Sequence, residues 1–534
     1  MPLRPSENAR LDNEVTQRIR AIAVSAPDCI SGSKADRALN SCDPVSLFNA
    51  CRCAASLAQK GTGAWAKSNW GESGRKTREY FLLMYSLDDM DRFKDLLISE
   101  QPNVLLIGAM TLCMPGAIEC AKVAKKMLGN KLLVVLGGRH INETIYLSNE
   151  KHRAASLVKH HRASPGRLIR ENKIPPVFDI IVSGEAEKLI VEIGEIFVRS
   201  THLATAFIAR HLATSTAGLW IADFPCIQKT VVSDGIRLKH DDLPSAVGVF
   251  GVTASFGVFG GRMTSHVFSY TGPGCIYDCS FCSERRSVTG SIQEIKGAPR
   301  RIYKQFEETL STISQAYPNR GASAFVEDST FLSGSPLAIS QLCQLMEDRP
   351  LDIVFGGQFT IDQILSRKDI IRRLAKNGLR YVFVGLETLN PQEIGGMSKD
   401  IDSKKQKWQE RFSEALNFLI ENKISCGCAL LFGLGEQHSS RLDLLRHLIN
   451  LRDHVGQPIT ISTNWAVQHP LRGYPGSASE DYLRWGTPEG KLLEQFHNFG
   501  EASLEYPLCG IARPSLAEVQ EIIDLLNQFE TING

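Results

Sequence analysis

Two blocks of alternating strand and helix patterns constrain the fold of this 534-residue chain more than any other feature. In the first block, short apolar runs of the buried parallel-strand type occupy residues 104–108, 131–136 and 178–182. Helical patterns at 116–128 and 187–199 separate or follow these runs, and glycines stand where the strands end. This alternation predicts an open, doubly wound α/β sheet, in which ligands bind outside the carboxyl ends of the strands.

A second, longer series of strand–helix units follows residue 263. Strands are expected at 324–327, 352–355, 381–384, 428–432 and 459–462. Helices are expected before and between them, at 303–316, 337–346, 368–376, 409–421 and 441–454. Repeated units of this kind predict a parallel barrel that is closed or partly closed.

These patterns divide the chain into five segments. They are a polar N-terminal extension (1–75), a Rossmann-like domain (76–200), a linker with short strands (201–262), a partial barrel (263–462) and a C-terminal cap ending in a helix (463–534). The extension is expected to contain one amphipathic helix, at 43–60, and no chemistry.

Composition excludes several classes of protein. The chain has 60 lysine and arginine residues and 58 aspartate and glutamate residues, so its formal net charge is +2. We therefore expect no basic surface for binding nucleic acids or anionic membranes. No apolar run is long enough to cross a bilayer, and the first residues lack the apolar core of an export signal. Fourteen cysteines in so long a chain do not make a disulfide scaffold, so we expect a cytoplasmic protein.

Three cysteines within eight residues carry the clearest chemical signal. Cys275, Cys279 and Cys282 follow the spacing Cys-x3-Cys-x2-Cys, and Phe281 precedes the third thiol. Three thiolates on one loop suit an iron–sulfur cluster better than structural zinc, which takes four protein ligands, although zinc or simple burial remain alternatives. With three thiolates, one iron of a 4Fe-4S cluster keeps an open position. The arrangement resembles the signature of the radical S-adenosylmethionine (SAM) enzymes, in which SAM chelates that iron.

Polar or small residues follow several strands of the second block, where barrels place their functional groups. Glu327 and Asp328 are candidate partners of the SAM ammonium group, with a helix cap as the alternative. Gln358 is a candidate for the SAM carboxylate or ribose, or else a turn residue. The candidate SAM contacts are Phe281, Glu327, Asp328, Gln358, Glu387, Gly433 and Gly435.

The stretches 384–388, 397–399 and 432–436 resemble the matching motifs of radical SAM enzymes of the class typified by methylthiotransferases and the anaerobic coproporphyrinogen oxidase. The resemblance covers about residues 265–465. It implies a partial (β/α)6 barrel, a reducing electron donor such as flavodoxin or ferredoxin, and a 5′-deoxyadenosyl radical that abstracts hydrogen from the substrate.

The strand ends of the first block resemble the loops of the cobalamin-binding domain found in cobalamin-dependent radical SAM enzymes. The residues that this resemblance implies at the cofactor are Thr111, Gly137, Gly138, His140, Ser183, Gly184 and Glu185. The chain departs from the family because it lacks an Asp-x-His-x-x-Gly loop, has only residues 79–84 as a candidate first strand, and carries a basic insertion at 145–176. The alternatives are a Rossmann-like module without cobalamin, a turn role for His140 and a solvated helical insertion.

The two resemblances together imply a cobalamin-dependent radical SAM enzyme that methylates an unactivated carbon of a small molecule through a 5′-deoxyadenosyl radical and methylcobalamin. One alternative is oxidation, ring contraction or cyclisation without methyl transfer. Another is an iron–sulfur protein that binds SAM without turnover. The substrate pocket is expected between the two sheets, under a tail whose candidate lining residues are Trp465, His469, Arg472, Tyr474 and Tyr482.

Overall fold

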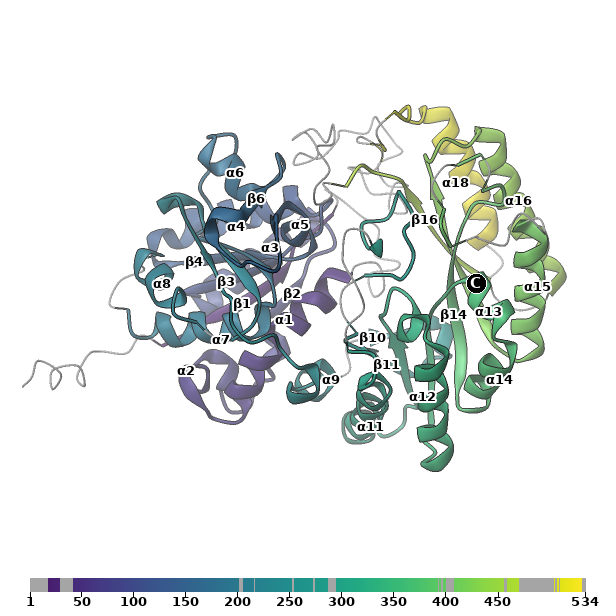
Figure 1. Cartoon of the computed structure of the whole chain (residues 1–534), viewed down its shortest axis with the longest axis horizontal. Helices are drawn as coiled ribbons and strands as arrows, with labels where there is room; N and C mark the ends of the chain where they lie inside the picture. Colours follow the sequence, from purple (N-terminus) through teal and green to yellow (C-terminus); the bar gives the residue numbers. More distant parts are fainter. Residues whose placement is uncertain are drawn as a thin grey trace, which may run out of the picture.

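The computed structural model places two seven-stranded sheets in separate bodies (Figure 1). It describes residues 18–28, 42–200, 205–215, 217–251, 254–271, 274–286, 294–391, 393–394, 397–399, 408–455, 459–469, 504, 507–508 and 510–530. Among these residues, no helix is long and apolar enough to cross a membrane.

The first sheet has the strand order β2-β1-β3-β4-β7-β8-β9. Its strands are β1 (Ala21–Ser25), β2 (Phe81–Leu83), β3 (Val104–Gly108), β4 (Leu133–Gly137), β7 (Ile180–Gly184), β8 (Trp220–Phe224) and β9 (Lys229–Val232). The strands from β2 to β7 are parallel, and β8 and β9 extend the edge in antiparallel fashion.

Helices cover both faces of this sheet, because successive strand residues point to opposite sides. Val104 and Leu106 of β3 pack into one core, while Leu105 and Ile107 pack into the other. The first core takes residues from α1 (Cys42–Gln59), α2 (Gly63–Ala66), α7 (Ala186–Phe197) and α8 (Thr205–Leu212). The second takes residues from α3 (Met90–Glu100), α4 (Met114–Leu128), α5 (Arg139–Thr144) and α6 (Pro165–Arg170). The sheet is therefore doubly wound, as predicted.

The first sheet extends beyond the segment 76–200 in both directions. β1 lies inside the expected extension and pairs along its whole length with β3, while α1 packs on the sheet where the sequence predicted a helix. Residues 79–84 supply β2, which pairs with the other side of β1. β8 and β9 come from the expected linker. The fold unit of the first sheet thus includes residues that the sequence pattern assigned to the extension and linker.

The basic insertion is a hairpin followed by a short helix, whereas the sequence pattern allowed a helical excursion. β5 (Ile145–Leu147) and β6 (Val158–His160) pair in antiparallel fashion, and α6 follows. Arg170 of α6 binds Asp223 of β8 at 3.0 Å, so part of the basic charge of the insertion is neutralised internally.

The second sheet has the order β10-β11-β12-β13-β14-β15-β16, with β11 to β16 parallel. Its strands are β10 (Ala254–Ser255), β11 (Met263–Val267), β12 (Ala322–Val326), β13 (Ile353–Phe359), β14 (Leu379–Glu387), β15 (Ser425–Phe432) and β16 (Ile459–Trp465). This open series of parallel strands confirms the predicted partial barrel. Of these strands, the sequence pattern missed β11, while β10 lies in the expected linker with short strands.

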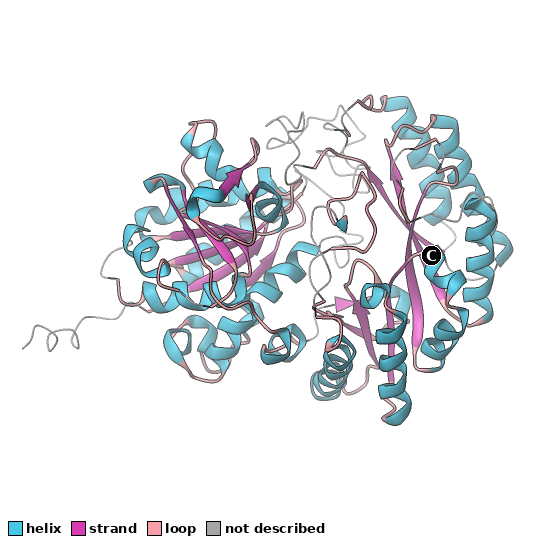
Figure 2. Ribbon diagram, viewed as in Figure 1, coloured by secondary structure: helices cyan, strands magenta, loops and turns pink. Residues whose placement is uncertain are grey.

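Helices pack on the outer face of the second sheet, and Figure 2 shows those that follow β14 and β15 on the side away from the first body. They are α11 (Ala298–Ala316), α12 (Pro336–Asp348), α13 (Ile361–Ser366), α14 (Lys368–Lys376), α15 (Trp408–Glu421) and α16 (His438–Val455). The C-terminal helix α18 (Leu516–Glu530) packs on α16 and contributes Ile522 and Leu526 to the same core. The concave side of the half-barrel is left facing the first body.

Candidate functional site

The three cysteines lie on a compact loop that follows β11 at the carboxyl edge of the half-barrel. The Cys275 amide donates to the carbonyl of Glu284 at 2.7 Å, which brings the two ends of the loop together. Inside it, the Cys282 amide donates to the carbonyl of Cys279 at 3.1 Å. The backbone thus holds all three thiols within one tight turn.

Neighbouring strand ends reach these thiols. The Cys275 Sγ atom lies 3.3 Å from Thr330 Oγ1, after β12, and the Cys279 Sγ atom lies 3.8 Å from Ser398 Oγ, after β14. Burial raises the pKa of Cys282 to about 12, and the nearby Cys279 and Cys275 add to the shift. The three thiols are therefore close enough to influence one another.

This donor set fits a 4Fe-4S cluster. Within the described part of the chain, no three His, Cys, Asp or Glu side chains converge on a point that could hold a single metal ion. A cluster distributes its cysteines over different irons, so it accepts thiols that are near one another without meeting at one point.

Glu387 and Lys399 form a buried ion pair beside the cysteine loop, with Glu387 Oε1 2.6 Å from Lys399 Nζ. Glu387 has a φ of 60° and follows a register shift at the end of β14, which turns its side chain out of the strand alternation. Burial opposes the charge on Lys399, yet Glu387 and the thiols of Cys279 and Cys282 raise its pKa. The lysine therefore brings positive charge to the site, a role that the sequence motif alone did not assign.

The two carboxylates after β12 have different surroundings. Glu327 forms a short contact with the Nδ1 atom of His266, on the neighbouring β11, and both side chains are partly exposed. Asp328 is partly buried, and it accepts hydrogen bonds from the Ser269 amide and hydroxyl at 3.0 and 2.7 Å and from the Leu332 amide at 2.9 Å. Burial raises the pKa of Asp328 to about 6. These contacts tie Asp328 to the loops at Ser269 and Leu332, a role that the predicted ligand and helix-cap alternatives did not include, and they leave Glu327 as the better candidate ligand.

The other expected SAM contacts lie along the same edge. Gln358 is partly exposed in β13, and Phe281 packs against Leu434 and Ala466. Gly433 and Gly435 have φ values of +81° and +112° in the turn after β15. The amides of Gly433 and Leu434 donate to the Glu436 carboxylate at 2.7 and 2.8 Å. This turn therefore has a fixed backbone.

The three expected loops of the first sheet also meet at one edge. Gly138 approaches so closely that an added Cβ would lie 2.5 Å from the backbone of Ala109. Gly137 precedes it at the end of β4, and its carbonyl accepts from the Ala109 amide at 3.1 Å. Ser183 donates to the carbonyl of Ile145 at 2.8 Å.

Gly184 and Glu185 form hydrogen bonds with segments outside β7. The Gly184 amide donates to Asn142 Oδ1 at 2.9 Å. Glu185 accepts from the amides of Leu219 and Leu238 at 2.8 and 3.1 Å. Both residues lie at the predicted edge, and these contacts tie the edge to β8 and the segment that follows β9.

His140 is fully buried behind this edge, and both of its ring nitrogens are engaged. Its Nδ1 atom lies 3.1 Å from Thr111 Oγ1, and its Nε2 atom lies 3.2 Å from the carbonyl oxygen of Ala163. Burial lowers the pKa of His140 to about 3, so the ring is neutral. These contacts favour the backbone-bonded alternative over a ligand that projects into a cofactor pocket.

Polar side chains join the edge of the first sheet to the cysteine loop. Arg139 of α5 forms a short ion pair with Glu284, two residues beyond Cys282. Glu143 of the same helix lies 4.0 Å from His469, measured from Oε2 to Nδ1, and His469 belongs to the segment after β16. Sequence reasoning placed His469 in the pocket but missed Glu143. Arg472, Tyr474 and Tyr482 lie outside the described residues.

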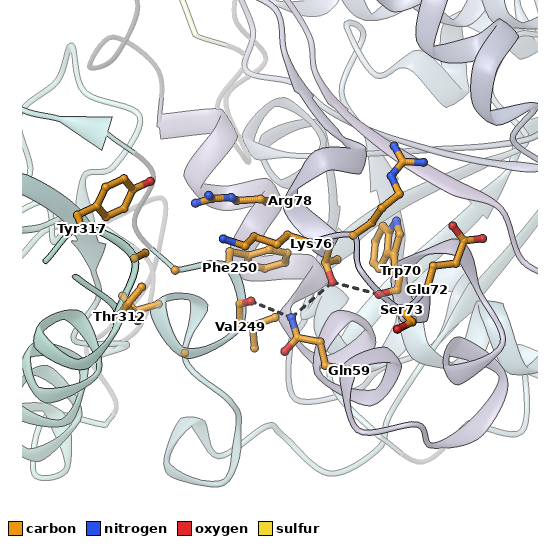
Figure 3. Close-up of a pocket in the computed structure, with 17 residues that line it drawn as sticks. Gln59, Trp70, Glu72, Ser73, Lys76, Arg78, Val249, Phe250, Thr312 and Tyr317 are labelled. Carbon is orange, nitrogen blue, oxygen red and sulfur yellow. Dashed lines mark hydrogen bonds between the residues drawn. The ribbon is translucent and has the colours of Figure 1, made fainter. Parts of the chain in front are cut away.

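A cavity of about 470 Å³ lies elsewhere, between the first body and the ends of α9 (Ala246–Phe250) and α11 (Figure 3). Lys76 and Arg78 line one side, and Thr312 and Tyr317 line the other. Tyr317 stands where α11 ends, before β12 begins, and so at the amino edge of the half-barrel. The cavity is therefore separate from the cysteine loop.

Residues 269–448 match the family model described as the radical SAM superfamily. No curated protein matches the chain. Among solved structures, the radical SAM methyltransferase TsrM from Kitasatospora setae, with cobalamin and a 4Fe-4S cluster bound, is similar at 13% identity and a TM-score of 0.45, over 84% of this chain and 72% of that one. Methylornithine synthase (PylB) is similar at 14% identity and a TM-score of 0.29, over 52% and 65%.

SuiB from Streptococcus suis bound to S-adenosylmethionine is similar at 12% identity and a TM-score of 0.30, over 51% of this chain and 49% of that one. The family match spans the cysteine loop and the parallel strands from β12 to β15. This chain therefore carries a domain of the radical SAM superfamily.

Proposed function

We propose that this protein is a cobalamin-dependent radical SAM enzyme that methylates an unactivated carbon of a small molecule. The proposal rests on the contacts between the carboxyl edge of the first sheet and the cysteine loop at the carboxyl edge of the half-barrel. Arg139 and Glu143, behind the strand ends of the first sheet, reach Glu284 and Ser283 of the cysteine loop. In α/β sheets and barrels alike, ligands bind at these edges, so both cofactor sites would open on one space.

The residues of the half-barrel fit a cluster and SAM. Cys275, Cys279 and Cys282 would hold the cluster, and Lys399 would offset its negative charge. Glu327 is the candidate for the SAM amine, and the backbone turn at Gly433 is the candidate surface for the adenine ring. When bound, the cluster and SAM supply one-electron chemistry, and cobalamin supplies a methyl group for transfer.

The strand ends of the first sheet would hold cobalamin. Gly138, with a φ of +110°, and Gly184, with a φ of +98°, let the backbones of Ala109 and Leu219 pack closely against neighbouring strand ends, which fixes the shape of this edge. His140 does not serve as a cobalt ligand in this proposal, since both ring nitrogens are occupied. Cobalamin would therefore be held by shape and backbone contacts.

The test is SAM turnover by the anaerobically purified, cluster-reconstituted full chain, with dithionite as reductant and hydroxocobalamin present. A methylase is expected to form both 5′-deoxyadenosine and S-adenosylhomocysteine. 5′-Deoxyadenosine alone would point to oxidation or rearrangement. Absence of both products, with about four irons bound per chain, would contradict an enzymatic role and favour SAM binding without turnover.

A further inference from the structure

A chain of hydrogen bonds ends on a buried carboxyl group between the first sheet and the cysteine loop. The carbonyl oxygen of Ala163 lies 3.2 Å from His140 Nε2, and His140 Nδ1 lies 3.1 Å from Thr111 Oγ1. Thr111 Oγ1 in turn lies 3.3 Å from Glu143 Oε2. All three side chains are buried, Glu143 being 5% exposed.

The tautomer of His140 decides which group donates along this chain. A carbonyl oxygen only accepts, so the Nε2 atom of His140 carries a proton. The ring is neutral, so its Nδ1 atom accepts the one proton of the Thr111 hydroxyl. Thr111 Oγ1 and Glu143 Oε2 would then face each other as two acceptors, unless Glu143 holds a proton between them.

The surroundings of Glu143 support a neutral carboxylic acid. Burial raises the pKa of Glu143 to about 7, against the opposing influence of Arg139 and of side-chain hydrogen bonds with Ser283 and Thr111. Arg139 forms an ion pair with Glu284 of the cysteine loop. Burial also lowers the pKa of His469 to about 4, so the imidazole that faces Glu143 is neutral. Glu143 and His469 therefore face each other without net charge, beside an ion pair that is already balanced.

Two buried polar atoms of these side chains are left without a hydrogen bond among the described residues. Neither Glu143 Oε1 nor His469 Nδ1 makes a hydrogen bond of good geometry with any residue that the structure describes. The 4.0 Å between Glu143 Oε2 and His469 Nδ1 is too long for a direct hydrogen bond. Buried polar groups are normally paired, so two such atoms side by side mark the position of a ligand group.

We propose that Glu143 and His469 form an uncharged hydrogen-bonding site for an uncharged N–H or O–H donor, such as a carboxamide, a hydroxyl or a ring N–H. Glu143 Oε1 accepts the bond, and a carboxylate or an ammonium group in the same place would be buried without a counter-charge. The site deepens the proposed function and rests on it, because it lies where substrate and cobalamin would meet. The donor belongs either to the substrate or to a carboxamide of the corrin ring.

The first arm of the test measures protonation and needs no cofactor. Infrared absorption of the full chain at pH 6 is expected to show the carbonyl band of a protonated carboxylic acid, and E143Q is expected to remove it. The exposed Glu119 gives a matched control, E119Q, which should leave the band unchanged. A spectrum in which E143Q removes no such band would overturn the proposal, whether or not the chain is a radical SAM enzyme.

The second arm measures ligand preference on the cluster-reconstituted chain. The affinity for nicotinamide is compared with that for nicotinate, and the affinity for indole-3-acetamide with that for indole-3-acetate. The affinity for hydroxocobalamin is measured afterwards. Wild type and E143Q, which preserves the carbonyl acceptor, are expected to prefer the amides at least tenfold, and E143L is expected to lose that preference. Equal or reversed preference in wild type would overturn the proposal.

Hydroxocobalamin then identifies the source of the donor. A tenfold or greater loss of affinity in E143L but not in E143Q assigns the donor to the corrin ring. An unchanged affinity, together with the amide preference, assigns it to the substrate. If no probe distinguishes E143L from E143Q, the proposal is overturned. Iron content and circular dichroism establish whether E143L is folded. If E143L does not fold, the infrared comparison of wild type with E143Q tests the proposal.

Discussion

At the scale of single residues, Gly433 is a position in the candidate site that does not accommodate a side chain. Its φ is +81°, and an added Cβ would lie 2.3 Å from the Nε1 atom of Trp465. G433A therefore combines backbone strain with a clash against a buried ring. We expect it to lower the free energy of unfolding by about 2–4 kcal/mol in urea titrations.

Gly260 provides the control for this experiment. Its φ is +62°, and a Cβ there would meet nothing within 4 Å. G260A isolates the strain and is expected to cost about 1 kcal/mol. Equal losses in G433A and G260A would show that contact with Trp465 does not constrain the turn after β15.

Substitution of Cys282 tests whether this thiol is a cluster ligand or is simply buried. C282A is expected to reduce the iron content of the reconstituted chain from about four per chain to below about one, with loss of the visible cluster absorption. C226A changes an exposed thiol outside the loop and is expected to retain full iron. Retention of iron by C282A would contradict the assignment of the three ligands.

The sequence was a good guide to residues whose role depends on local spacing. The three cysteines could be proposed as ligands from the sequence, because their spacing on one loop forms a motif. Glu143 could not be predicted, because its site forms where α5, the cysteine loop and the segment after β16 pack together. This tertiary contact leaves no pattern in the sequence of α5. Glu387 was predicted as a SAM contact, whereas Lys399 belonged to a recognised motif without any predicted contact.

At the scale of elements, Arg52 links α1 to the rest of the molecule. Its side chain is fully buried, lies 3.6 Å from Glu187 of α7, and stacks 4.2 Å from the centre of the Tyr270 ring. R52M leaves the Glu187 carboxyl buried without its cation. We expect a loss of about 3–5 kcal/mol in the free energy of unfolding, measured by urea denaturation.

Two further variants test the cause of that loss. R52M/E187L removes both members of the pair and is expected to recover much of the stability. R92M breaks an exposed pair with Asp89 in α3 and should cost less than about 1 kcal/mol. If R52M costs no more than R92M, the buried pair does not stabilise the contact between α1 and α7.

β1 shows why the element boundaries could not all be predicted. Residues 21–25 form a short run of small apolar residues without a clear helix beside it in the sequence, so no strand–helix alternation marks it. Only pairing with β3 and β2 makes it a central strand. The longer apolar runs of β3, β4 and β15 could be predicted, because burial on both faces leaves a continuous signal.

A shortened chain tests the boundary. A protein that begins at residue 76 lacks β1 and α1, which exposes the β3 edge and one face of the first sheet. We expect the first body to lose its cooperative unfolding transition in calorimetry, while the full chain retains it. A shortened chain with both transitions intact would show that residues before 76 are an extension after all.

At the scale of the whole molecule, buried neutral histidines predict sensitivity to acid. Burial lowers the pKa of His140 and His240 to about 3 and of His161 to about 4, against an ordinary value of about 6.5. The unfolded chain takes up these protons first as the pH falls. Stability from these groups is therefore complete above pH 6.5 and is lost between about pH 6.5 and 3, by up to about 1.4 kcal/mol per pKa unit for each histidine.

Unfolding free energies across this range measure the effect. H140Q is expected to flatten the curve, and H152Q, at an exposed position, should leave it unchanged. Glu143 acts in the opposite sense, since its raised pKa favours the folded state at low pH and that contribution is lost as the pH rises through about 7. An H140Q curve that falls as steeply as the wild-type curve would contradict a neutral, buried His140.

The central claim, that a cluster and cobalamin share the space between the two sheets, is tested most directly by metal content. Iron and cobalt would be determined together in the full chain after anaerobic purification from cells supplied with cobalamin. The account predicts about four irons and one cobalt per chain. Four irons without cobalt would contradict the cobalamin site and leave a radical SAM domain joined to a Rossmann-like sheet of another purpose.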